Sequence, residues 1–214
     1  MILLTGATGI IGRKLIDLLY QQGRKLRVLS LPNDPQVSWI EQQKKAEVVF
    51  GDITQPETLN NIWDQIDTVF HLAAVIISTH QPQLYQKVNL QGTRNLIDKA
   101  RVHRVEHFIY ISSASVYYPR SNLYAVSKKV AEQVVKESGL NYTIVRPTLV
   151  YGPEGGEEFY HFVNYLKRFP IIPFIGAGRA LKAPIYVDDL VTALAAIPYN
   201  KITVSYTHLT LPTN

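Results

Sequence analysis

Three glycines spaced three residues apart lie within the first twelve residues, between a short apolar run and an amphipathic segment. The run Ile2–Thr5 predicts a buried strand, and residues 10–22 predict a helix. Between them, Gly6 permits a tight turn, Gly9 lets a phosphate approach the backbone, and Gly12 lets the helix pack closely on the strand. Because the helix N-terminus presents unpaired N–H groups and the positive end of its dipole, this arrangement predicts a pyrophosphate site.

The rest of the chain repeats this alternation of short β-rich runs and longer amphipathic segments. Further strands are expected at Leu26–Ser30, 46–50, 68–72, 107–112 and 142–146, and further helices at 56–63, 82–101, 123–138 and Glu157–Arg168. Apolar strands that alternate with helices are typical of βαβ units, in which helices cover both faces of a parallel sheet. The sequence therefore predicts an α/β fold, a doubly wound parallel sheet of the Rossmann type.

The composition changes near residue 151, where Gly152, Pro153 and two further glycines interrupt the pattern. We expect residues 1–150 to form a dinucleotide-binding domain that also carries the catalytic residues. Residues 151–203 are expected to form part of a small, incomplete C-terminal substrate lobe.

Two shorter segments complete this division of the chain. Residues 185–187 predict a strand, and Asp188 is expected to cap a helix over 189–197. Residues 204–214 have no charge and no helical period, and they match the peptide that a sequencing-library adapter encodes in one frame. We therefore expect a non-native tail from about Val204 onward.

Composition and charge exclude several classes of function. Hydrophobic residues make up 46% and charged residues 18% of the chain, which is an ordinary globular composition. The net charge of +5 comes from scattered basic residues, which argues against nucleic-acid binding and suits an anionic cofactor. The absence of cysteine excludes thiolate chemistry and fits a reducing cytoplasm, and the apolar N-terminal run is too short for a signal peptide or membrane span. His103 and His107 lie where a helix gives way to a strand, so no metal site is expected.

The second predicted strand, Leu26–Ser30, ends without the acidic residue that binds the adenosine ribose 2′-hydroxyl in many dinucleotide folds. Ser30 stands at that point and can bind either a 2′-hydroxyl or a 2′-phosphate. Arg13, Arg27 or another nearby basic residue can neutralise the phosphate. The sequence therefore leaves NAD and NADP open as cofactors, with a slight preference for NADP.

Tyr124 and Lys128 lie one turn apart on the predicted helix 123–138, so their side chains share one face. An ammonium beside a phenol favours the phenolate, so we expect Lys128 to lower the pKa of Tyr124. Such a tyrosine is a usable acid or base near neutral pH. The spacing alone also fits an ordinary surface pair, and its significance comes from the glycine turn and from Ser113 upstream.

These motifs together resemble the extended branch of the short-chain dehydrogenase/reductase superfamily, in particular its NAD(P)-dependent sugar epimerase/dehydratase family. The resemblance runs from Met1 to about Ile197. The motifs, in the family's order, are residues 5–12, Gly51-Asp52-Ile53, His71-Leu72-Ala73-Ala74, Val88-Asn89-Leu90-Gln91-Gly92-Thr93, Ser112-Ser113-Ala114-Ser115-Val116-Tyr117, the pair Tyr124 and Lys128, Arg146-Pro147 with Val150-Tyr151-Gly152-Pro153, and Tyr186-Val187-Asp188-Asp189.

The resemblance implies a hydride-transfer enzyme that acts on a nucleotide-sugar-like hydroxyl or carbonyl. Tyr124 is then the acid/base, Lys128 binds the nicotinamide ribose, and Ser113, with Ser115 as the nearby alternative, orients the substrate oxygen. The cofactor-binding residues that it implies are Gly6, Thr8, Gly9, Ile10, Ile11, Gly12, Ser30, Asp52, Ile53, Leu72, Ala73, Ala74, Asn89, Tyr124, Lys128 and Pro147. The family also implies a homodimer through helices 82–101 and 123–138.

The chain departs from the family's pattern in two respects. The segment between Ser113 and Tyr124 is short for a sugar epimerase, and the chain ends where the family continues with further substrate-domain elements. Two alternatives stay open: an NADP-dependent reductase of a steroid- or flavonoid-like ketone, and a non-catalytic dinucleotide-binding regulator. The presence of both Tyr124 and Lys128 disfavours the regulator.

Overall fold

A six-stranded parallel sheet with strand order β3-β2-β1-β4-β5-β6 forms the centre of the protein. The computed structural model describes residues 1–77, 80–119, 121–153, 157–169 and 183–199. The strands of this sheet are β1 (Ile2–Thr5), β2 (Leu26–Ser30), β3 (Glu47–Phe50), β4 (Thr68–His71), β5 (His107–Ile111) and β6 (Tyr142–Val145). The strand order reverses direction at β1 and β4, which is where dinucleotide folds open a crevice at the carboxyl ends of their strands.

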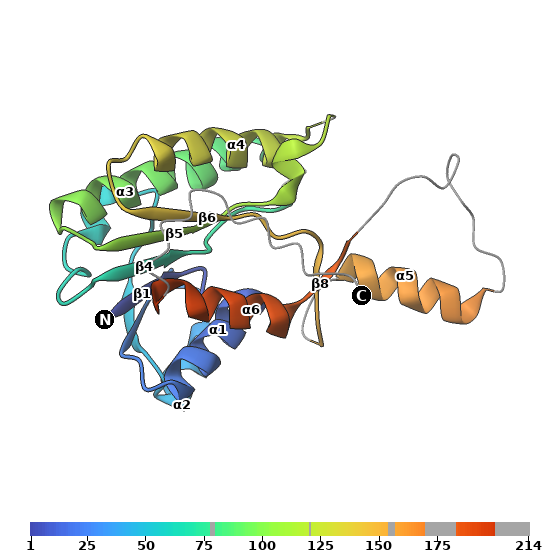
Figure 1. The fold of residues 1–214 in the computed structure, drawn as a ribbon, viewed down its shortest axis with the longest axis horizontal. Coiled ribbons are helices and arrows are strands. Elements are labelled where there is room, and N and C mark those ends of the chain that lie inside the picture. Colours follow the sequence, from blue (N-terminus) through green and yellow to red (C-terminus); the bar gives the residue numbers. More distant parts are fainter. Residues whose placement is uncertain (78–79, 120, 154–156, 170–182, 200–214) are drawn as a thin grey trace.

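Helices cover both faces of this sheet, which confirms the predicted doubly wound fold (Figure 1). The helices are α1 (Ile10–Gln21), α2 (Val37–Gln43), α3 (Thr93–Val102), α4 (Leu123–Lys136), α5 (Glu157–Arg168) and α6 (Val187–Ala196), with shorter segments η1 (Pro56–Leu59), η2 (Tyr85–Gly92), η3 (Ala114–Tyr117) and η4 (Ile197–Tyr199). In Figure 1, α1, α2 and α6 lie on one side of the sheet, α3 and α4 lie on the other, and α5 lies apart from both layers.

The two helical layers require strands that are apolar on both faces, and the sequence supplies them. Ile2 and Leu4 of β1 belong to the core under α1 and α6, whereas Leu3 belongs to the core under α3 and α4. All four residues of β1 are buried. Because side chains alternate between the faces of a strand, a continuous apolar run is what a sheet covered on both sides requires.

Helix α6 packs against α1 and completes the first of these cores. Its residues Val187, Leu190, Val191 and Leu194 are buried in that core, although this segment was expected within the substrate lobe. The expectation that Asp188 caps the helix is wrong, because the helix begins at Val187 with its N-cap one residue earlier. Asp188 instead lies in the first turn, where its negative charge interacts favourably with the positive end of the helix dipole.

The helices expected at 56–63 and 82–101 differ from the observed elements. Only the 3-10 helix η1 forms in the first segment, and there the Trp63 indole donates a 2.5 Å hydrogen bond to the Leu59 carbonyl. The second segment contains the π-helix η2 before α3 begins at Thr93. Helix α2 was missed, because its seven residues are too few for a clear helical period.

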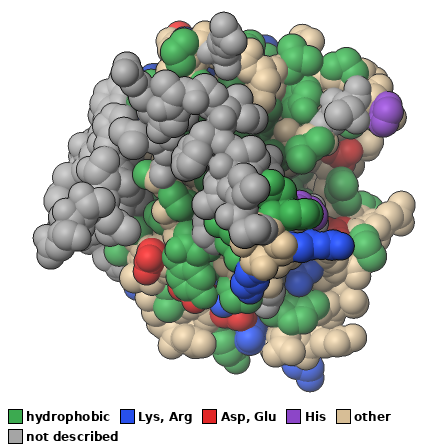
Figure 2. Space-filling view, turned by 90° about the vertical axis from the view of Figure 1, so that its right-hand side faces the viewer, with side chains coloured by type: hydrophobic (Ala, Val, Ile, Leu, Met, Phe, Trp, Pro, Cys, Tyr) green, Lys and Arg blue, Asp and Glu red, His purple; other side chains and the backbone are tan. Residues whose placement is uncertain are grey.

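A second, two-stranded sheet lies beyond the main one. It pairs β7 (Val150–Tyr151) with β8 (Ile185–Tyr186) in parallel, near the boundary that the glycines at 152–156 predicted. Figure 2, which views the molecule from the side of α5, shows basic, acidic and hydrophobic side chains interspersed on the described part of that face. The expected tail 204–214 lies outside the described residues.

Candidate active site

The glycine turn between β1 and α1 brings backbone directly against backbone. Gly6 has a φ of +69°, and a Cβ on it would lie 2.5 Å from the backbone nitrogen of Ala73. A Cβ on Gly12 would lie 2.5 Å from the Cα of Ala7. Gly9 has open space around it apart from the Gly6 carbonyl oxygen at 3.5 Å, and as N-cap it leaves α1 without a side-chain cap. The turn therefore combines a crowded base with an open helix N-terminus suited to an anion.

A cleft of about 560 Å³ opens beside this turn, a volume typical of cofactor and small-molecule sites. Twelve of the residues that the sequence assigned to the cofactor line it: Gly6, Thr8, Gly9, Ile10, Ile11, Gly12, Ser30, Asp52, Ile53, Leu72, Ala73 and Ala74. The other assigned residues, Asn89, Ser113, Tyr124, Lys128 and Pro147, are not part of this lining. The structure thus separates a binding cleft from a neighbouring group of polar side chains.

Asp34 is a cleft residue that the sequence did not single out. It lies four residues beyond the end of β2, and its Oδ2 accepts a 2.8 Å hydrogen bond from Thr8 Oγ1. Its Oδ1 accepts a 2.9 Å bond from the backbone N–H of Gln36. The end of β2 itself carries Ser30, as the sequence showed, and the loop after it adds the carboxylate of Asp34 to the cleft. The Asn-Asp-Pro turn signal after β2 was the available clue, because such turns bring a loop back toward the strand end.

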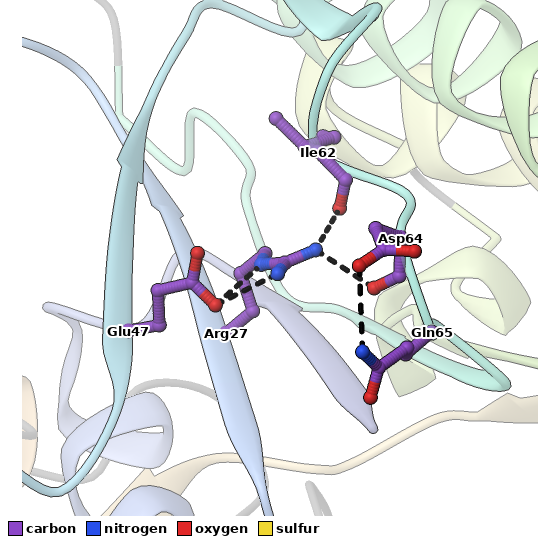
Figure 3. Close-up of polar contacts among 5 residues, drawn as sticks. All are labelled: Arg27, Glu47, Ile62, Asp64 and Gln65. Carbon is purple, nitrogen blue, oxygen red and sulfur yellow. Dashed lines mark hydrogen bonds and ion pairs between the residues drawn. The ribbon is translucent and has the colours of Figure 1, made fainter.

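Arg27, one of the arginines considered as a partner for a 2′-phosphate, does not line the cleft and is bonded to Glu47 and to two backbone carbonyls (Figure 3). Its Nε and Nη2 donate to Glu47 Oε2 at 3.0 and 2.7 Å. Its Nη1 donates to the carbonyl oxygens of Ile62 and Asp64 at 3.0 and 2.9 Å. This buried guanidinium ties β2 to β3 and to the segment before β4, so its role is structural.

A buried chain of hydrogen bonds links β1, β4 and the start of α3. His71 Nδ1 lies 2.7 Å from Thr5 Oγ1, and His71 Nε2 lies 2.9 Å from Thr93 Oγ1. Thr93 donates onward to the Asn89 carbonyl at 2.7 Å, so its oxygen accepts from His71, which fixes the proton on Nε2. Burial lowers the pKa of His71 to about 3, with a smaller contribution from Lys128, and the ring is neutral at physiological pH.

Asn89 projects from the π-helix η2 into contacts with neighbouring segments. Its Oδ1 accepts from the Val75 N–H at 2.7 Å, and its Nδ2 donates to the Val75 carbonyl at 2.9 Å and to Ser127 Oγ at 3.0 Å. Val75 itself lines the cleft. The side chain therefore joins the wall of the cleft to α4, and π-helical turns of this kind recur at functional sites.

Tyr124 lies near two hydrogen-bonded serines, Ser113 and Ser115, at the start of η3. The N–H and O–H of Ser115 both donate to Ser113 Oγ, at 3.2 and 2.9 Å. Burial raises the pKa of Tyr124 above 10, and the hydrogen bond from Ser113 lowers it by a smaller amount. The structure therefore differs from the expectation of a lowered pKa, because burial of the phenol outweighs its hydrogen bond.

Lys128 is a buried amine, only 1% exposed, one turn after Tyr124. Its Nζ donates a 2.6 Å hydrogen bond to the carbonyl of Ile111, a residue that lines the cleft, and lies 4.1 Å from the centre of the Tyr110 ring. Burial lowers its pKa from 10.5 to about 7, while Glu132 opposes that shift. A proton can therefore leave or join this amine near neutral pH.

A buried ion pair supports the same helix. Glu132 of α4 accepts two hydrogen bonds of 2.7 Å from Arg146, which follows β6, and both side chains are about 5% exposed. The Arg146 guanidinium lies 5.1 Å from the centre of the Tyr117 ring in η3. Next to it, the Pro147 carbonyl accepts a 2.9 Å bond from the Ala114 N–H. Residues after β6 thus position η3, which carries Ser115, against α4.

The histidines of the segment 103–107 are engaged elsewhere. The His103 ring stacks on Trp63 with centroids 5.5 Å apart, and His107 Nε2 lies 2.9 Å from Thr143 Oγ1. Within the described ranges, no group of three or more His, Asp or Glu side chains is placed to hold a metal ion. The described helices also include none that is long and apolar enough to cross a bilayer.

The fold and the site define a class of protein: a doubly wound α/β protein with a dinucleotide-sized cleft at its topological switch point and a Ser–Tyr–Lys group beside it. The chain belongs to the NAD dependent epimerase/dehydratase family, whose model matches residues 2–203. This result confirms the family that the sequence motifs indicated.

Named relatives share this fold with different activities in their names. The chain is 31% identical over 196 residues to the ceramide reductase of Caulobacter vibrioides, a match that covers 92% of this chain and 60% of that protein. It is 27% identical to the N-acetyl-alpha-D-glucosaminyl-diphospho-ditrans,octacis-undecaprenol 4-epimerase of Escherichia coli O157:H7, with 89% of this chain and 60% of that protein covered. The chain spans about half to three fifths of the length of the first curated relatives.

Solved structures show the same fold. The UDP-glucuronic acid 4-epimerase of Bacillus cereus, in complex with UDP-glucuronic acid and NAD, superimposes with a TM-score of 0.76. The match covers 95% of this chain and 74% of that structure, at 23% sequence identity. At this identity the likeness establishes the architecture, and the chemistry must be argued from the residues of this chain.

Proposed function

We propose that this chain carries the cofactor half of an NAD(P)-dependent enzyme that interconverts a hydroxyl and a carbonyl on a nucleotide-sugar-like substrate. The single observation that carries the proposal is the position of Tyr124 on α4 one helical turn before the buried amine of Lys128. That amine bonds to Ile111 in the wall of the cleft. When bound, a nicotinamide cofactor supplies the acceptor or donor of the hydride.

The proton chemistry follows from the order of donors around Tyr124. Because burial raises its pKa, Tyr124 is a neutral phenol at physiological pH and is ready to donate a proton. When a carbonyl carbon receives a hydride, the phenol gives its proton to the carbonyl oxygen, which leaves an alcohol and a phenolate. Ser115 donates to Ser113, and Ser113 lowers the pKa of Tyr124, so Ser113 favours the phenolate as it forms. The reverse sequence oxidises an alcohol.

Relatives support a nucleotide-sugar-like substrate, since the Escherichia coli protein and others in the family are named as sugar epimerases. In a substitution test, Tyr124→Phe is expected to lower turnover by about 10²–10⁴-fold while leaving NADH or NADPH binding intact. Turnover is measured as interconversion of a UDP-sugar and its C4 epimer by chromatography, and binding as nucleotide fluorescence. Tyr20→Phe, an exposed tyrosine on α1, is the matched control and is expected to keep full turnover.

The outcomes separate the parts of the proposal. Unchanged turnover in Tyr124→Phe would remove Tyr124 as the acid/base. Failure of the wild-type chain to bind either reduced nucleotide would refute the cofactor site itself.

A second candidate is a reductase of a lipid-like or steroid-like ketone. It is favoured by the ceramide reductase relative and by a 3-beta-hydroxysteroid dehydrogenase from Mycolicibacterium neoaurum that is 30% identical over 178 residues. Supplying a hydrophobic ketone with NADH or NADPH and following the absorbance of the reduced nucleotide decides between the two. Oxidation of the nucleotide with the ketone, and no epimerisation of UDP-sugars, would select the reductase.

Three further expectations belong to this proposal. We propose the division into a 1–150 binding domain and a 151–203 partial substrate lobe, with α6 returning to the first core. A homodimer through α3 and α4 is supported by the exposed apolar residues Leu123, Val126 and Val130 on α4, and light scattering would test it. A cytoplasmic location stays a prediction from the absence of cysteine.

A further inference from the structure

We propose that the buried pair of Glu132 and Arg146 positions the catalytic group, by holding the serine segment at η3 against helix α4. This inference rests on the proposed function, in which Ser113, Tyr124 and Lys128 act on the substrate and the cofactor. Glu132 lies eight residues after Tyr124 and four after Lys128 on α4, so the three side chains project from one side of the helix. Arg146 follows β6 and donates to both oxygens of Glu132, each at 2.7 Å.

Stability alone does not require these two charges in the interior. Arg146 is 4% and Glu132 5% exposed, and the core beside them already contains Ala131 and Val135 of the same helix. The cost of desolvating two ions largely cancels their attraction, and apolar side chains of similar volume are often at least as stabilising. An apolar pair does not supply direction, however. The two parallel bonds of the planar guanidinium fix the angle as well as the distance between α4 and the segment after β6.

The backbone on either side of Arg146 fixes the position of Ser113. The carbonyl of the residue before Arg146 accepts a 2.7 Å bond from the Ser112 N–H, and the carbonyl of the residue after it accepts a 2.9 Å bond from the Ala114 N–H. Ser113 lies between these two donors. The Arg146 guanidinium also lies 5.1 Å from the centre of the Tyr117 ring in η3. Because the side chain of Arg146 is bonded to α4, the place of Ser113 relative to that helix is set through Arg146.

The carboxylate of Glu132 also bears on the amine of Lys128, one turn earlier on α4. Burial lowers the pKa of Lys128 to about 7, and the charge of Glu132 opposes this shift by a smaller amount. Because Arg146 donates to both carboxylate oxygens, it holds that charge at a fixed place relative to the amine. The pair therefore acts on both parts of the catalytic group, the serine segment and the lysine.

The test replaces the pair as a whole, because a single substitution would leave one buried charge without its partner. The double variant Glu132→Met with Arg146→Met is expected to unfold at a urea concentration no lower than that of the wild type. Its kcat is expected to fall by about 10–100-fold with KM unchanged, because misalignment slows the chemical step and leaves the substrate contacts in place. Turnover is measured as interconversion of a UDP-sugar and its C4 epimer, and as oxidation of NADH with a hydrophobic ketone.

Amide hydrogen exchange, measured by NMR, reports on the position of the serine segment without any turnover. The Ala114 N–H is expected to exchange about fivefold faster in the double variant, because that factor corresponds to the net worth of one hydrogen bond. The Phe108 N–H, which bonds to the Asn141 carbonyl near the start of β5, is expected to exchange at the wild-type rate. Glu137→Met removes an exposed carboxylate at the end of α4 and is the matched control, with kcat and exchange expected to be unchanged.

The possible results separate this inference from the function on which it rests. An unchanged kcat, or an unchanged Ala114 exchange rate, in the folded double variant would overturn the positioning role alone. A wild-type chain that binds neither NADH nor NADPH, or that turns over neither substrate, would overturn the proposed function and this inference with it. A fall in kcat at unchanged KM and unchanged NADH affinity, together with faster exchange at Ala114, is the result that supports the pair as a positioning element.

Discussion

Replacing Lys128 with methionine is expected to stabilise the fold at neutral pH while removing the amine proposed to act beside Tyr124. Lys128 is fully buried in the folded chain, and burial lowers its pKa from 10.5 to about 7. Between these two values the unfolded chain binds more protons than the folded chain. The stability of the wild-type chain therefore rises with pH across this window. The loss of stability caused by burying the amine is largest at and below pH 7.

The magnitude follows from the shift in the pKa and from the contacts of the amine. The difference of 10.5 minus 7 is 3.5 units, which at about 1.4 kcal/mol per unit gives a deficit of roughly 5 kcal/mol at low pH. Methionine has no amine to protonate, so it removes that loss of stability. It also leaves the Ile111 carbonyl without its 2.6 Å hydrogen bond, which costs about 1–3 kcal/mol. We expect the variant to be about 2–4 kcal/mol more stable near pH 7 and less stable than wild type near pH 10.

Urea unfolding at one-unit steps from pH 6 to pH 10, followed by far-UV circular dichroism, measures this difference. Lys129→Met is the matched control, because Lys129 is an exposed lysine on the same helix. Its stability relative to wild type is expected to be independent of pH. A Lys128→Met variant that is less stable than wild type at pH 6, by an amount that does not change up to pH 10, would refute the argument.

Two further predictions concern the glycine turn and the buried histidine. Gly6→Ala is expected to lower the free energy of unfolding by more than about 2 kcal/mol, because the added Cβ would lie 2.5 Å from a backbone atom. Gly23 has a similar φ of +74° but open space around it, so Gly23→Ala is expected to cost only about 1 kcal/mol. Thermal unfolding of both variants measures the difference. The folded-state pKa of His71 is depressed to about 3, so the unfolded chain takes up the proton first and wild-type stability falls as the pH drops below 6.5. Between pH 7 and pH 4.5, the free energy of unfolding of His71→Gln is expected to fall by about 3 kcal/mol less than that of the wild type, as measured by urea unfolding. An equal fall in both proteins would count against a neutral His71.

Much of the fold was accessible from the sequence because local patterns and global topology agree. The apolar run at Ile2–Thr5 and the β-rich segment Leu26–Ser30 predicted strands, and both strands are buried on both faces. Predictions failed where a side chain took the place of a backbone donor, as where the Trp63 indole bonds to the Leu59 carbonyl four residues earlier. Periodicity reports which face of an element is apolar and carries no information about such a contact.

The candidate site divides in the same way. Spacing alone is enough to recognise the glycines of the turn, where one backbone segment packs closely on another. It is also enough to recognise that Tyr124 and Lys128 lie one helical turn apart. The return of the loop after β2, which brings Asp34 to Thr8, depends on how that loop folds against the glycine turn. The direction of the Tyr124 pKa shift likewise depends on burial, which spacing does not report.

The sequence by itself determined the alternation of strands and helices, the glycine turn and the shared helical face of Tyr124 and Lys128. Each strand, each helix and the glycine turn depends on neighbours within a few residues, so the chain's local pattern is sufficient to specify them. Only the tertiary structure decided the burial of Lys128 and the place of Asp34 in the cleft. Both depend on groups from distant segments, because desolvation and hydrogen bonding are set by what surrounds a side chain in space.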